Sequence, residues 1–172
     1  MTTVPSDLDF DVERTSVRVV LLDGTGAVLM FRTVDAGTPG LGSWWELPGG
    51  GMEAGETVAD TAVRELLEET GFDLAPSEVG APTWSRSATY LRRGRRILQH
   101  EHVVVARVAS AAPTPARDGR TPEELEDYVG HRWWVVGDVV ASAERFFPGR
   151  LPDLLVPFLA GEPIVEPFEW WN

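Results

Sequence analysis

The chain has 172 residues, of which 43% are hydrophobic, and it contains no cysteine. This length allows one domain with a substantial core and modest extensions. The lack of cysteine excludes disulfides, thiolate metal sites and cysteine nucleophiles. With 27 acidic and 15 basic residues, the formal net charge is −12 at pH 7, which argues against a general nucleic-acid-binding protein. The charge either serves solubility or is partly clustered to hold a metal ion.

The two ends of the chain are expected to be short extensions. Residues 1–15 are polar and acidic, without the basic start and apolar segment of a secretory signal, and no apolar run approaches the ~20 residues of a membrane span. We therefore expect a cytoplasmic protein with no membrane association, built from an arm at 1–14, one folded domain at 15–160 and a tail at 161–172. The tail ends in Trp170 and Trp171, which could pack on their own domain or across a homodimer.

The first part of the chain predicts a hairpin followed by a glycine-rich turn. Residues 17–22 are apolar and β-branched, which indicates a buried strand, and residues 27–32 are expected to return beside it. Residues 44–47 are expected to form a short strand. At 48–51 the sequence Pro-Gly-Gly-Gly follows, where the backbone must turn tightly.

Residues 57–70 predict the clearest helix. Thr57 and Asp60 form an N-terminal capping pair, and Gly71 is a natural stop. At about 100° per residue, four apolar side chains share one face, which we expect to pack in the core. They are Ala59, Val63, Leu66 and Leu67.

The rest of the chain predicts further strands and short helices. Two extended stretches, 83–90 and 97–108, flank a basic hairpin tip at 92–96, which could attract polyphosphate but which we interpret as solvated. Thr121 and Glu124 are expected to cap a short helix after a Pro/Ala-rich loop. A strand at 131–136, a helix capped by Asp138 and a last helix at 151–159 complete the pattern, which is typical of an α/β (α+β) sandwich with helix 57–70 packed on a mixed sheet.

Two histidines share one face of the second extended stretch. His100 and His102 could form a metal pair, but Mg²⁺ disfavours imidazole and no third nitrogen ligand is evident. We therefore interpret both as polar surface or core residues.

Three glutamates cluster on the predicted helix. Glu65, Glu68 and Glu69 stand at i, i+3 and i+4, within an arc of about 100° that we expect to lie largely opposite the apolar face. Each close pair costs a few tenths of a kcal/mol in repulsion, roughly, on an exposed helix. One interpretation is an ordinary solvated face, since glutamate is a strong helix former. The other is that a divalent cation such as Mg²⁺, which prefers oxygen ligands, offsets the repulsion.

The sequence around these glutamates has a regular spacing. It reads Gly50-x5-Glu56-x7-Arg64-Glu65-Leu66-x-Glu68-Glu69-x-Gly71-Phe72, which resembles the complete Nudix box. The preceding Trp-Glu-Leu-Pro-Gly at 45–49 also resembles the lead-in of that family, and the flanking strands extend the likeness across roughly 17–155. The resemblance implies a Nudix-like α/β/α sandwich. It also implies a Mg²⁺-dependent hydrolase, with Mn²⁺ as a possible substitute, that cleaves nucleoside diphosphates linked to another group.

The resemblance also implies roles for individual residues. Glu68 and Glu69 would bind the metal, with Glu65 as a further ligand or the general base, and the carbonyl of Gly49 as a main-chain ligand. Arg64 would orient the glutamates. The residues that would support the motif are Gly50, Glu56 and Gly71.

In this family the base often lies in a loop beyond the box. Glu123, Glu124 and Glu126 occupy such a segment here, although Glu124 is also the expected capping partner of Thr121. Glu101 is another candidate, unless it faces solvent from its strand.

Substrate contacts are less specified. Arg32 resembles a phosphate-contacting position or is a surface arginine, and either Trp44 or Trp45 could stack on a nucleobase, with Trp45 as our candidate. Tyr90 lies eighteen residues after Phe72, which resembles the tyrosine placement in dinucleoside polyphosphate hydrolases. The partner is expected to be a small nucleotide-type diphosphate rather than nucleic acid.

Other functions remain open at this point. A non-catalytic Nudix-fold module that binds a nucleotide for regulation is the alternative, although such modules usually have a decayed box. Prenyl diphosphate isomerases of this kind need a catalytic cysteine, which this chain lacks. An mRNA-decapping role would call for a basic surface, which the net charge of −12 opposes. The sequence does not choose between dNTPs, ADP-ribose, nucleotide sugars and dinucleoside polyphosphates.

Overall fold

The computed structural model describes residues 2–172, in which nine strands form one mixed sheet. The strands are β1 (Val12–Leu22), β2 (Val28–Val34), β3 (Ser43–Glu46), β4 (Trp84–Arg92), β5 (Arg95–Arg107), β6 (Tyr128–Trp134), β7 (Phe146–Phe147), β8 (Ile164–Val165) and β9 (Glu169–Trp170). The helices are α1 (Val58–Thr70), α2 (Pro122–Asp127), α3 (Val136–Ala141) and α4 (Leu151–Leu159), and 3-10 turns lie at η1 (Pro39–Leu41) and η2 (Pro76–Glu78).

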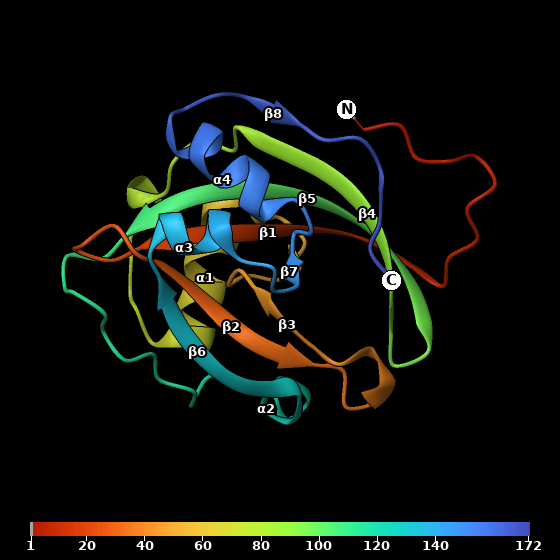
Figure 1. Cartoon of the computed structure of the whole chain (residues 1–172), viewed down its shortest axis with the longest axis horizontal. Coiled ribbons are helices and arrows are strands. Elements are labelled where there is room, and N and C mark those ends of the chain that lie inside the picture. Colours follow the sequence, from red (N-terminus) through yellow and green to blue (C-terminus); the bar gives the residue numbers. More distant parts are fainter. Residues whose placement is uncertain (1) are drawn as a thin grey trace.

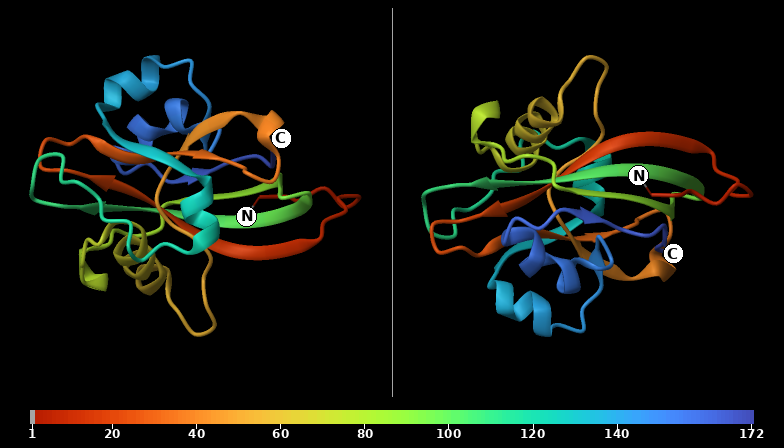
Figure 2. Two further views of the ribbon diagram at one scale, coloured as in Figure 1. Left: turned by 90° about the horizontal axis from the view of Figure 1, so that it is seen from below. Right: turned by 90° about the horizontal axis from the view of Figure 1, so that it is seen from above.

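The sheet curls between helices on its two faces (Figure 1). Its order is β7-β3-β2-β1-β5-β4-β8, with β6 paired to β2 and β9 paired to β4. Figure 2 shows α1 on one side of the strands and α3 and α4 on the other. The predicted α/β sandwich, with helix 57–70 packed on a mixed sheet, is confirmed.

β1 is the central strand of the sheet, and both of its faces are buried from Ser16 to Leu22. It runs antiparallel to β2 and parallel to β5. Since side chains alternate along a strand, Val17, Val19 and Leu21 pack beneath α1, whereas Val20 and Leu22 pack in the cluster that includes α3 and α4. β1 begins at Val12, before the predicted residue 17, because its polar first residues pair their backbones with β5.

The predicted ends of α1 are confirmed. The backbone N–H of Asp60 donates to Thr57 Oγ1 at 3.2 Å, and the backbone N–H of Thr57 donates to Asp60 Oδ2 at 3.0 Å. Gly71 ends the helix with a φ of 73°, in the left-handed region that glycine adopts without steric cost.

The predicted apolar face of α1 is wrong in part. Leu66 is buried with Ala62, but Leu67 is 49% exposed. Glu65 and Glu69 are buried beside Leu66 rather than lying opposite the core-facing side. Only a narrow apolar strip of α1 packs on the sheet, and Glu65 and Glu69, on one side of this strip, line a polar pocket. Tertiary structure therefore buries carboxylates that an apolar-in, polar-out pattern assigns to solvent.

The β4–β5 hairpin confirms the two predicted extended stretches, but its tip is not simply solvated. Arg92 Nη2 lies 3.0 Å from Asp127 Oδ2. Arg93 Nη2 lies 2.8 Å from Glu126 Oε2 and 3.0 Å from Asp127 Oδ1. The tip closes against α2 through these ion pairs, so the solvated interpretation is wrong for these two arginines.

The segment after the hairpin contains the expected short helices. α2 has the predicted capping box, in which Thr121 and Glu124 exchange hydrogen bonds. α3 begins after Val135, so Asp138 lies within its first turn and the prediction that it caps that helix is wrong. α4 matches the helix predicted at 151–159.

The tail packs on its own domain. β8 and β9 run parallel to β4, and the ring of Trp171 meets Trp44 and Phe147 edge to face, with centroids 5.0 and 5.2 Å apart. In the part of the chain that the structure describes, no helix combines the length and apolarity needed to cross a membrane.

The two histidines lie on a polar face of the sheet. His100 Nδ1 is 2.8 Å from Ser87 Oγ, and His100 Nε2 is 3.0 Å from Glu13 Oε1. His102 is partly buried near them. The hydrogen bonds of His100 and the partial burial of His102 agree with the interpretation of both as polar surface or core residues.

Candidate active site

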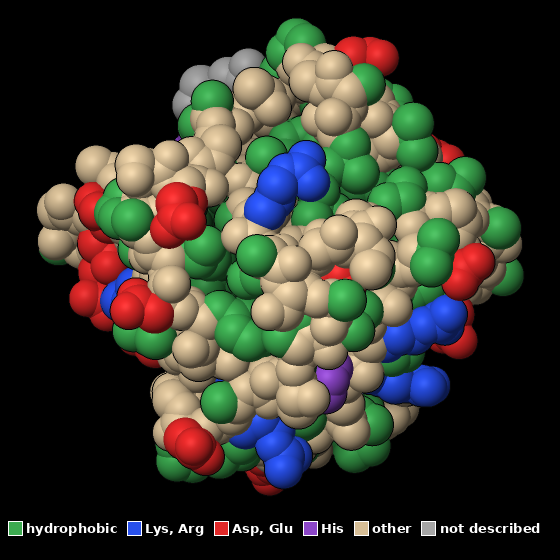
Figure 3. Space-filling view, turned by 90° about the vertical axis from the view of Figure 1, so that its left-hand side faces the viewer, with side chains coloured by type: hydrophobic (Ala, Val, Ile, Leu, Met, Phe, Trp, Pro, Cys, Tyr) green, Lys and Arg blue, Asp and Glu red, His purple; other side chains and the backbone are tan. Residues whose placement is uncertain are grey.

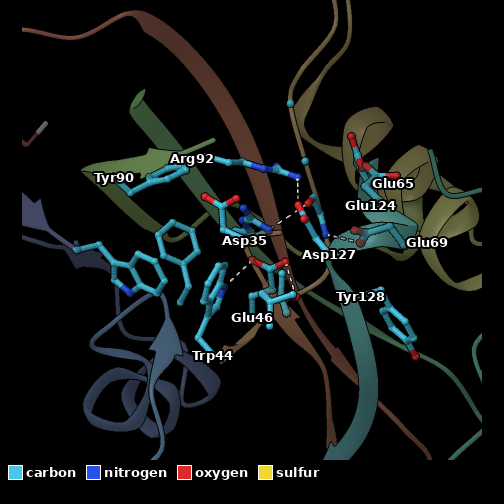
Figure 4. Close-up of a pocket in the computed structure, with 18 of the residues that line it drawn as sticks. Asp35, Trp44, Glu46, Glu65, Glu69, Tyr90, Arg92, Glu124, Asp127 and Tyr128 are labelled. Carbon is cyan, nitrogen blue, oxygen red and sulfur yellow. Dashed lines mark hydrogen bonds and ion pairs between the residues drawn. The ribbon is translucent and has the colours of Figure 1, made fainter. Parts of the chain in front are cut away.

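A pocket lies between α1, the glycine loop, the hairpin tip and α2 (Figure 4). Its two ends differ in chemistry. Glu65, Glu69 and Glu124 gather at one end, and Trp44 and Tyr90 lie at the other. Three further carboxylates stand between these ends and line the same pocket. They are Asp35, Glu46 and Asp127.

The glycine loop fits against β1 and leaves space for a carboxylate. Gly49 has a φ of 128°, and a Cβ there would overlap the carbonyl oxygen of Val17. A Cβ on Gly50 would lie 2.5 Å from Glu65 Oε1. The backbone N–H of Gly49 donates to Glu69 Oε2 at 2.8 Å. Side chains at these two positions would therefore displace β1 or Glu65, which explains the requirement for glycine.

An ion-pair brace joins this loop to α1. Arg64 Nε donates to Glu56 Oε1 at 2.6 Å, and Arg64 Nη2 donates to the carbonyl of Gly51 at 2.8 Å. Arg64 Nη1 lies 2.8 Å from Glu65 Oε1 and 3.4 Å from Glu68 Oε2. Hydrogen bonds from Arg64 hold the pKa of Glu56 at about 2, well below its ordinary value. Glu56 is therefore an ionised anchor, and Arg64 orients Glu65.

The two buried glutamates have raised pKa values. Burial raises the pKa of the Glu65 carboxyl, although Arg64 opposes the shift. Burial raises the pKa of the Glu69 carboxyl to about 8, with Glu65 adding to the shift and Arg120 opposing it. The charge of Glu65 disfavours the ionised form of Glu69, and the charge of Glu68 disfavours that of Glu65, so a cation beside these carboxylates would offset the repulsion.

The donor set of this end suits a divalent metal ion. Glu65, Glu69 and the Gly49 carbonyl supply the oxygen ligands that Mg²⁺ prefers. Glu68 is less well placed as a metal ligand, since 47% of its side chain is exposed. Residues 2–172 contain no group of three or more acidic or imidazole side chains already converged as a metal cage. Mg²⁺ commonly uses one or two carboxylates together with waters and substrate phosphate oxygens.

A buried arginine fixes the Gly49 carbonyl. Arg18 Nη1 donates to the carbonyls of Gly49 at 3.1 Å and Leu47 at 3.2 Å, and Arg18 Nε donates to Glu101 Oε1 at 2.9 Å. Glu101 also pairs with Arg86. Burial alone would raise the pKa of Glu101, but Arg86 and Arg18 together lower it. Glu101 is therefore an ionised core residue outside the pocket, neither solvent-facing nor placed as a base.

The aromatic end is a cluster of edge-to-face rings. Tyr90 and Phe147 have centroids 5.4 Å apart, and Trp44 packs on Trp171. Trp44 Nε1 donates to Glu46 Oε2 at 3.2 Å. This end offers ring surface for a planar group beside a carboxylate that can accept hydrogen bonds.

The family model for the NUDIX domain matches residues 12–152, which is most of the chain. The chain is a member of the Nudix hydrolase family. An RNA pyrophosphohydrolase of Teredinibacter turnerae is 26% identical over 171 residues, covering 92% of this chain and 96% of the relative. An RNA pyrophosphohydrolase of Dinoroseobacter shibae is 40% identical over 79 residues, a match to 46% of this chain and 47% of the relative.

Solved Nudix structures share the fold. The MutT protein from Methanosarcina mazei Go1 has a TM-score of 0.60 and 16% identity, covering 87% of this chain and 94% of that chain. The dihydroneopterin triphosphate pyrophosphohydrolase of E. coli has a TM-score of 0.59 and 17% identity, covering 84% and 97%. At such low identity these likenesses establish the architecture and not the substrate.

The structure brings three residues of the Nudix box to the pocket, together with Gly49 just before it. Glu65, Glu69, Gly49 and Gly50 line it, with Arg64 directly behind. Among the loop candidates for the base, only one lines the pocket in the described chain. This is Glu124, which also caps α2. The other two, Glu123 and Glu126, are exposed and face Arg93.

The expected substrate residues divide into two groups. Tyr90 lines the pocket. Trp45 instead packs in the core against Trp134, with ring centroids 5.2 Å apart, and Arg32 Nε donates to Ser43 Oγ at 3.1 Å outside the pocket. The pocket contains Trp44 in place of Trp45, because adjacent residues on β3 face opposite sides of the sheet.

Several pocket residues belong to no sequence motif. Arg18 and Arg120 are single arginines outside the box, and Phe147 and Trp171 come from the last third of the chain. Only the assembled fold brings these side chains into the same pocket as the glutamates. A buried arginine within an apolar strand, as at Arg18, was the one available hint.

Proposed function

We propose that this Nudix hydrolase uses Mg²⁺ to cleave a diphosphate linkage in a small nucleotide-type molecule. The observation that carries the proposal is the pair of buried carboxylates, Glu65 and Glu69, beside the Gly49 carbonyl in a pocket with an aromatic far end. A metal at one end and a planar group at the other match the two parts of a nucleotide.

The residues at the acidic end would share the chemical work. Glu65, Glu69 and the Gly49 carbonyl would hold Mg²⁺ or Mn²⁺, with Glu68 nearby. The metal, when bound, would polarise a phosphoryl oxygen and lower the pKa of an attacking water. Arg64 keeps Glu65 oriented through its 2.8 Å contact. Fixed hydrogen bonds of this kind reduce the reorganisation needed during the reaction.

Two carboxylates are candidates for the base that removes the proton from water. Glu65 lies on α1, and Glu124 lies at the start of α2, at the same end of the pocket. The carboxylate of Glu124 accepts the backbone N–H of Thr121 at 2.8 Å through Oε2, which leaves Oε1 for a proton. Comparing the pH–rate profiles of Glu65→Gln and Glu124→Gln would assign the base.

The aromatic end would hold the nucleobase. Trp44 and Tyr90 offer ring faces and edges, and Glu46 would accept hydrogen bonds from base N–H groups. A second candidate substrate is the 5′-triphosphate end of RNA, which the names of the RNA pyrophosphohydrolase relatives favour. We favour small molecules over RNA because a net charge of −12 disfavours binding of a polyanion. On the face shown in Figure 3, the basic side chains lie in separate patches among acidic and apolar ones.

A product-release assay tests the proposal. The purified protein would be incubated with Mg²⁺ and, in turn, dNTPs, ADP-ribose, nucleotide sugars, dinucleoside polyphosphates and 5′-triphosphorylated RNA. We expect phosphate, diphosphate or a nucleoside monophosphate from at least one small-molecule class, and its loss with a chelator. Ligand binding without any product would instead support the non-catalytic regulatory module, and cleavage of RNA alone would support the second candidate.

A further inference from the structure

Arg120 is a buried cation in the pocket with unused hydrogen-bond donors. Its side chain is only 4% exposed, and it lines the same pocket as the glutamates. Nη1 lies 3.9 Å from Glu69 Oε1, which is too long for a hydrogen bond. Within residues 2–172, Nε and Nη2 have no hydrogen-bond partner. Buried donors without partners are costly, so this arrangement favours a ligand that supplies acceptors.

The guanidinium is held in position by its surroundings. It lies 4.1 Å from the ring centroid of Phe31 and 4.6 Å from that of Tyr128. The preceding Gly119 passes so close to α1 that a Cβ there would lie 2.5 Å from the carbonyl oxygen of Glu68. The loop is thus fixed against the end of α1, and Arg120 is oriented before any ligand binds. Cation–π contacts hold the flat group while leaving its edge donors free.

The geometry points to Arg120 as a residue that binds the diphosphate of the substrate. This inference rests on the proposed function, since it names the group that would contact the phosphate oxygens beside Glu69. A guanidinium presents parallel N–H donors that match phosphate oxygens, which lysine does not do. Among the ion pairs of the described chain, Arg120 is the arginine that approaches Glu69. A phosphate that shares a cation with Glu69 would therefore lie next to it.

A simpler role for Arg120 would be to balance the charge of Glu69. The two roles predict different effects of Arg120→Gln. If Arg120 only balances Glu69, the variant should bind Mn²⁺ more tightly and bind a diphosphate unchanged. If Arg120 binds phosphate oxygens, the variant should lose affinity for the diphosphate.

The test uses methylenediphosphonate, which cannot be hydrolysed at its bridge, titrated by calorimetry with Mg²⁺ present. We expect Arg120→Gln to weaken its binding roughly 10- to 100-fold, the effect of losing hydrogen bonds to a charged group. Arg120→Lys keeps the charge but not the planar fork, so its affinity should fall to an intermediate value. Should the glutamine variant not fold, the lysine variant provides the test.

Arg117 provides a matched control. It lies in the same loop, 5.5 Å from the Tyr128 ring centroid, but it is exposed and outside the pocket. Arg117→Gln should leave methylenediphosphonate binding unchanged. An equal loss in both variants, or Mn²⁺ affinity rising in Arg120→Gln with diphosphate affinity unchanged, would overturn the inference.

Hydrolysis measured on the same preparations separates this inference from the proposed function. Wild-type protein that binds methylenediphosphonate but cleaves no nucleotide would contradict hydrolysis while supporting the anion site. A different outcome would contradict only the role of Arg120. In that outcome the wild-type protein cleaves nucleotides, and Arg120→Gln has the same kinetics and the same affinity for methylenediphosphonate as the wild type.

Discussion

Replacing Glu56 by glutamine would break the brace between the glycine loop and α1. The Glu56 carboxylate accepts hydrogen bonds from Arg64 Nε at 2.6 Å, Arg64 Nη2 at 3.0 Å, Thr61 Oγ1 at 2.7 Å and the Glu53 backbone N–H at 2.9 Å. Glutamine keeps the shape of the side chain but removes its charge, and it turns one acceptor into a donor that faces these donors.

The size of the effect follows from the pKa of Glu56. Hydrogen bonds from Arg64 lower it from 4.5 to about 2. At about 1.4 kcal/mol per pKa unit, the shift corresponds to ~3 kcal/mol of stability. The side chains of Arg64 and Glu56 are 23% and 17% exposed, and solvent screening reduces the expected loss to about 2 kcal/mol. Because the folded pKa lies below the unfolded one, this stability is fully present above about pH 4.5 and is lost as the pH falls towards about 2.

Urea unfolding of wild type and Glu56→Gln, followed by tryptophan fluorescence between about pH 7 and about pH 3, measures this contribution. The difference in unfolding free energy should be about 2 kcal/mol near neutral pH and should shrink below about 1 kcal/mol towards pH 3. Glu162→Gln, at an exposed position outside the pocket, should show no such difference. A difference that is absent at neutral pH, or that stays constant with pH, would refute the brace.

Three further predictions concern the pocket. Gly50→Ala would place a Cβ 2.5 Å from Glu65 Oε1, so kcat should fall at least roughly tenfold while circular dichroism stays unchanged; full activity would contradict the role of the glycine. Because both side chains are buried, Trp44→Ala and Trp45→Ala should each cost about 3 kcal/mol of stability, but only Trp44→Ala should raise KM for the nucleotide, about tenfold. The reverse pattern would contradict the assignment of the two tryptophans. A chelator should abolish turnover and added Mg²⁺ or Mn²⁺ should restore it, as measured by product release; activity that survives exhaustive chelation would exclude a metal-dependent mechanism.

The fold was predictable where local chemistry determines structure. The capping pair of Thr57 and Asp60, together with Gly71, specifies both ends of α1 without help from the rest of the chain. The apolar run in β1 is buried on both faces, so its assignment as a strand did not depend on its partners.

The site was predictable only where residue spacing carries the information. The spacing within the box located Glu65 and Glu69, but their burial arises from the pocket wall that the rest of the fold supplies. Whether Trp44 or Trp45 faces the pocket depends on how β3 pairs with β2 and β7, which composition does not specify. Arg120 lies in a loop without a motif, and only tertiary contacts bring it to Glu69.

The most direct test of the central claim compares the Mg²⁺-dependent turnover of wild type, Glu69→Gln and Glu65→Gln on the best nucleotide substrate, with circular dichroism as the check on folding. Glu162→Gln is the matched control, since it makes the same chemical change at an exposed position outside the pocket. If the two buried glutamates hold the metal and activate water, both box variants should remain folded and lose turnover, while the control keeps it. Near-full activity in folded Glu69→Gln protein would contradict the account.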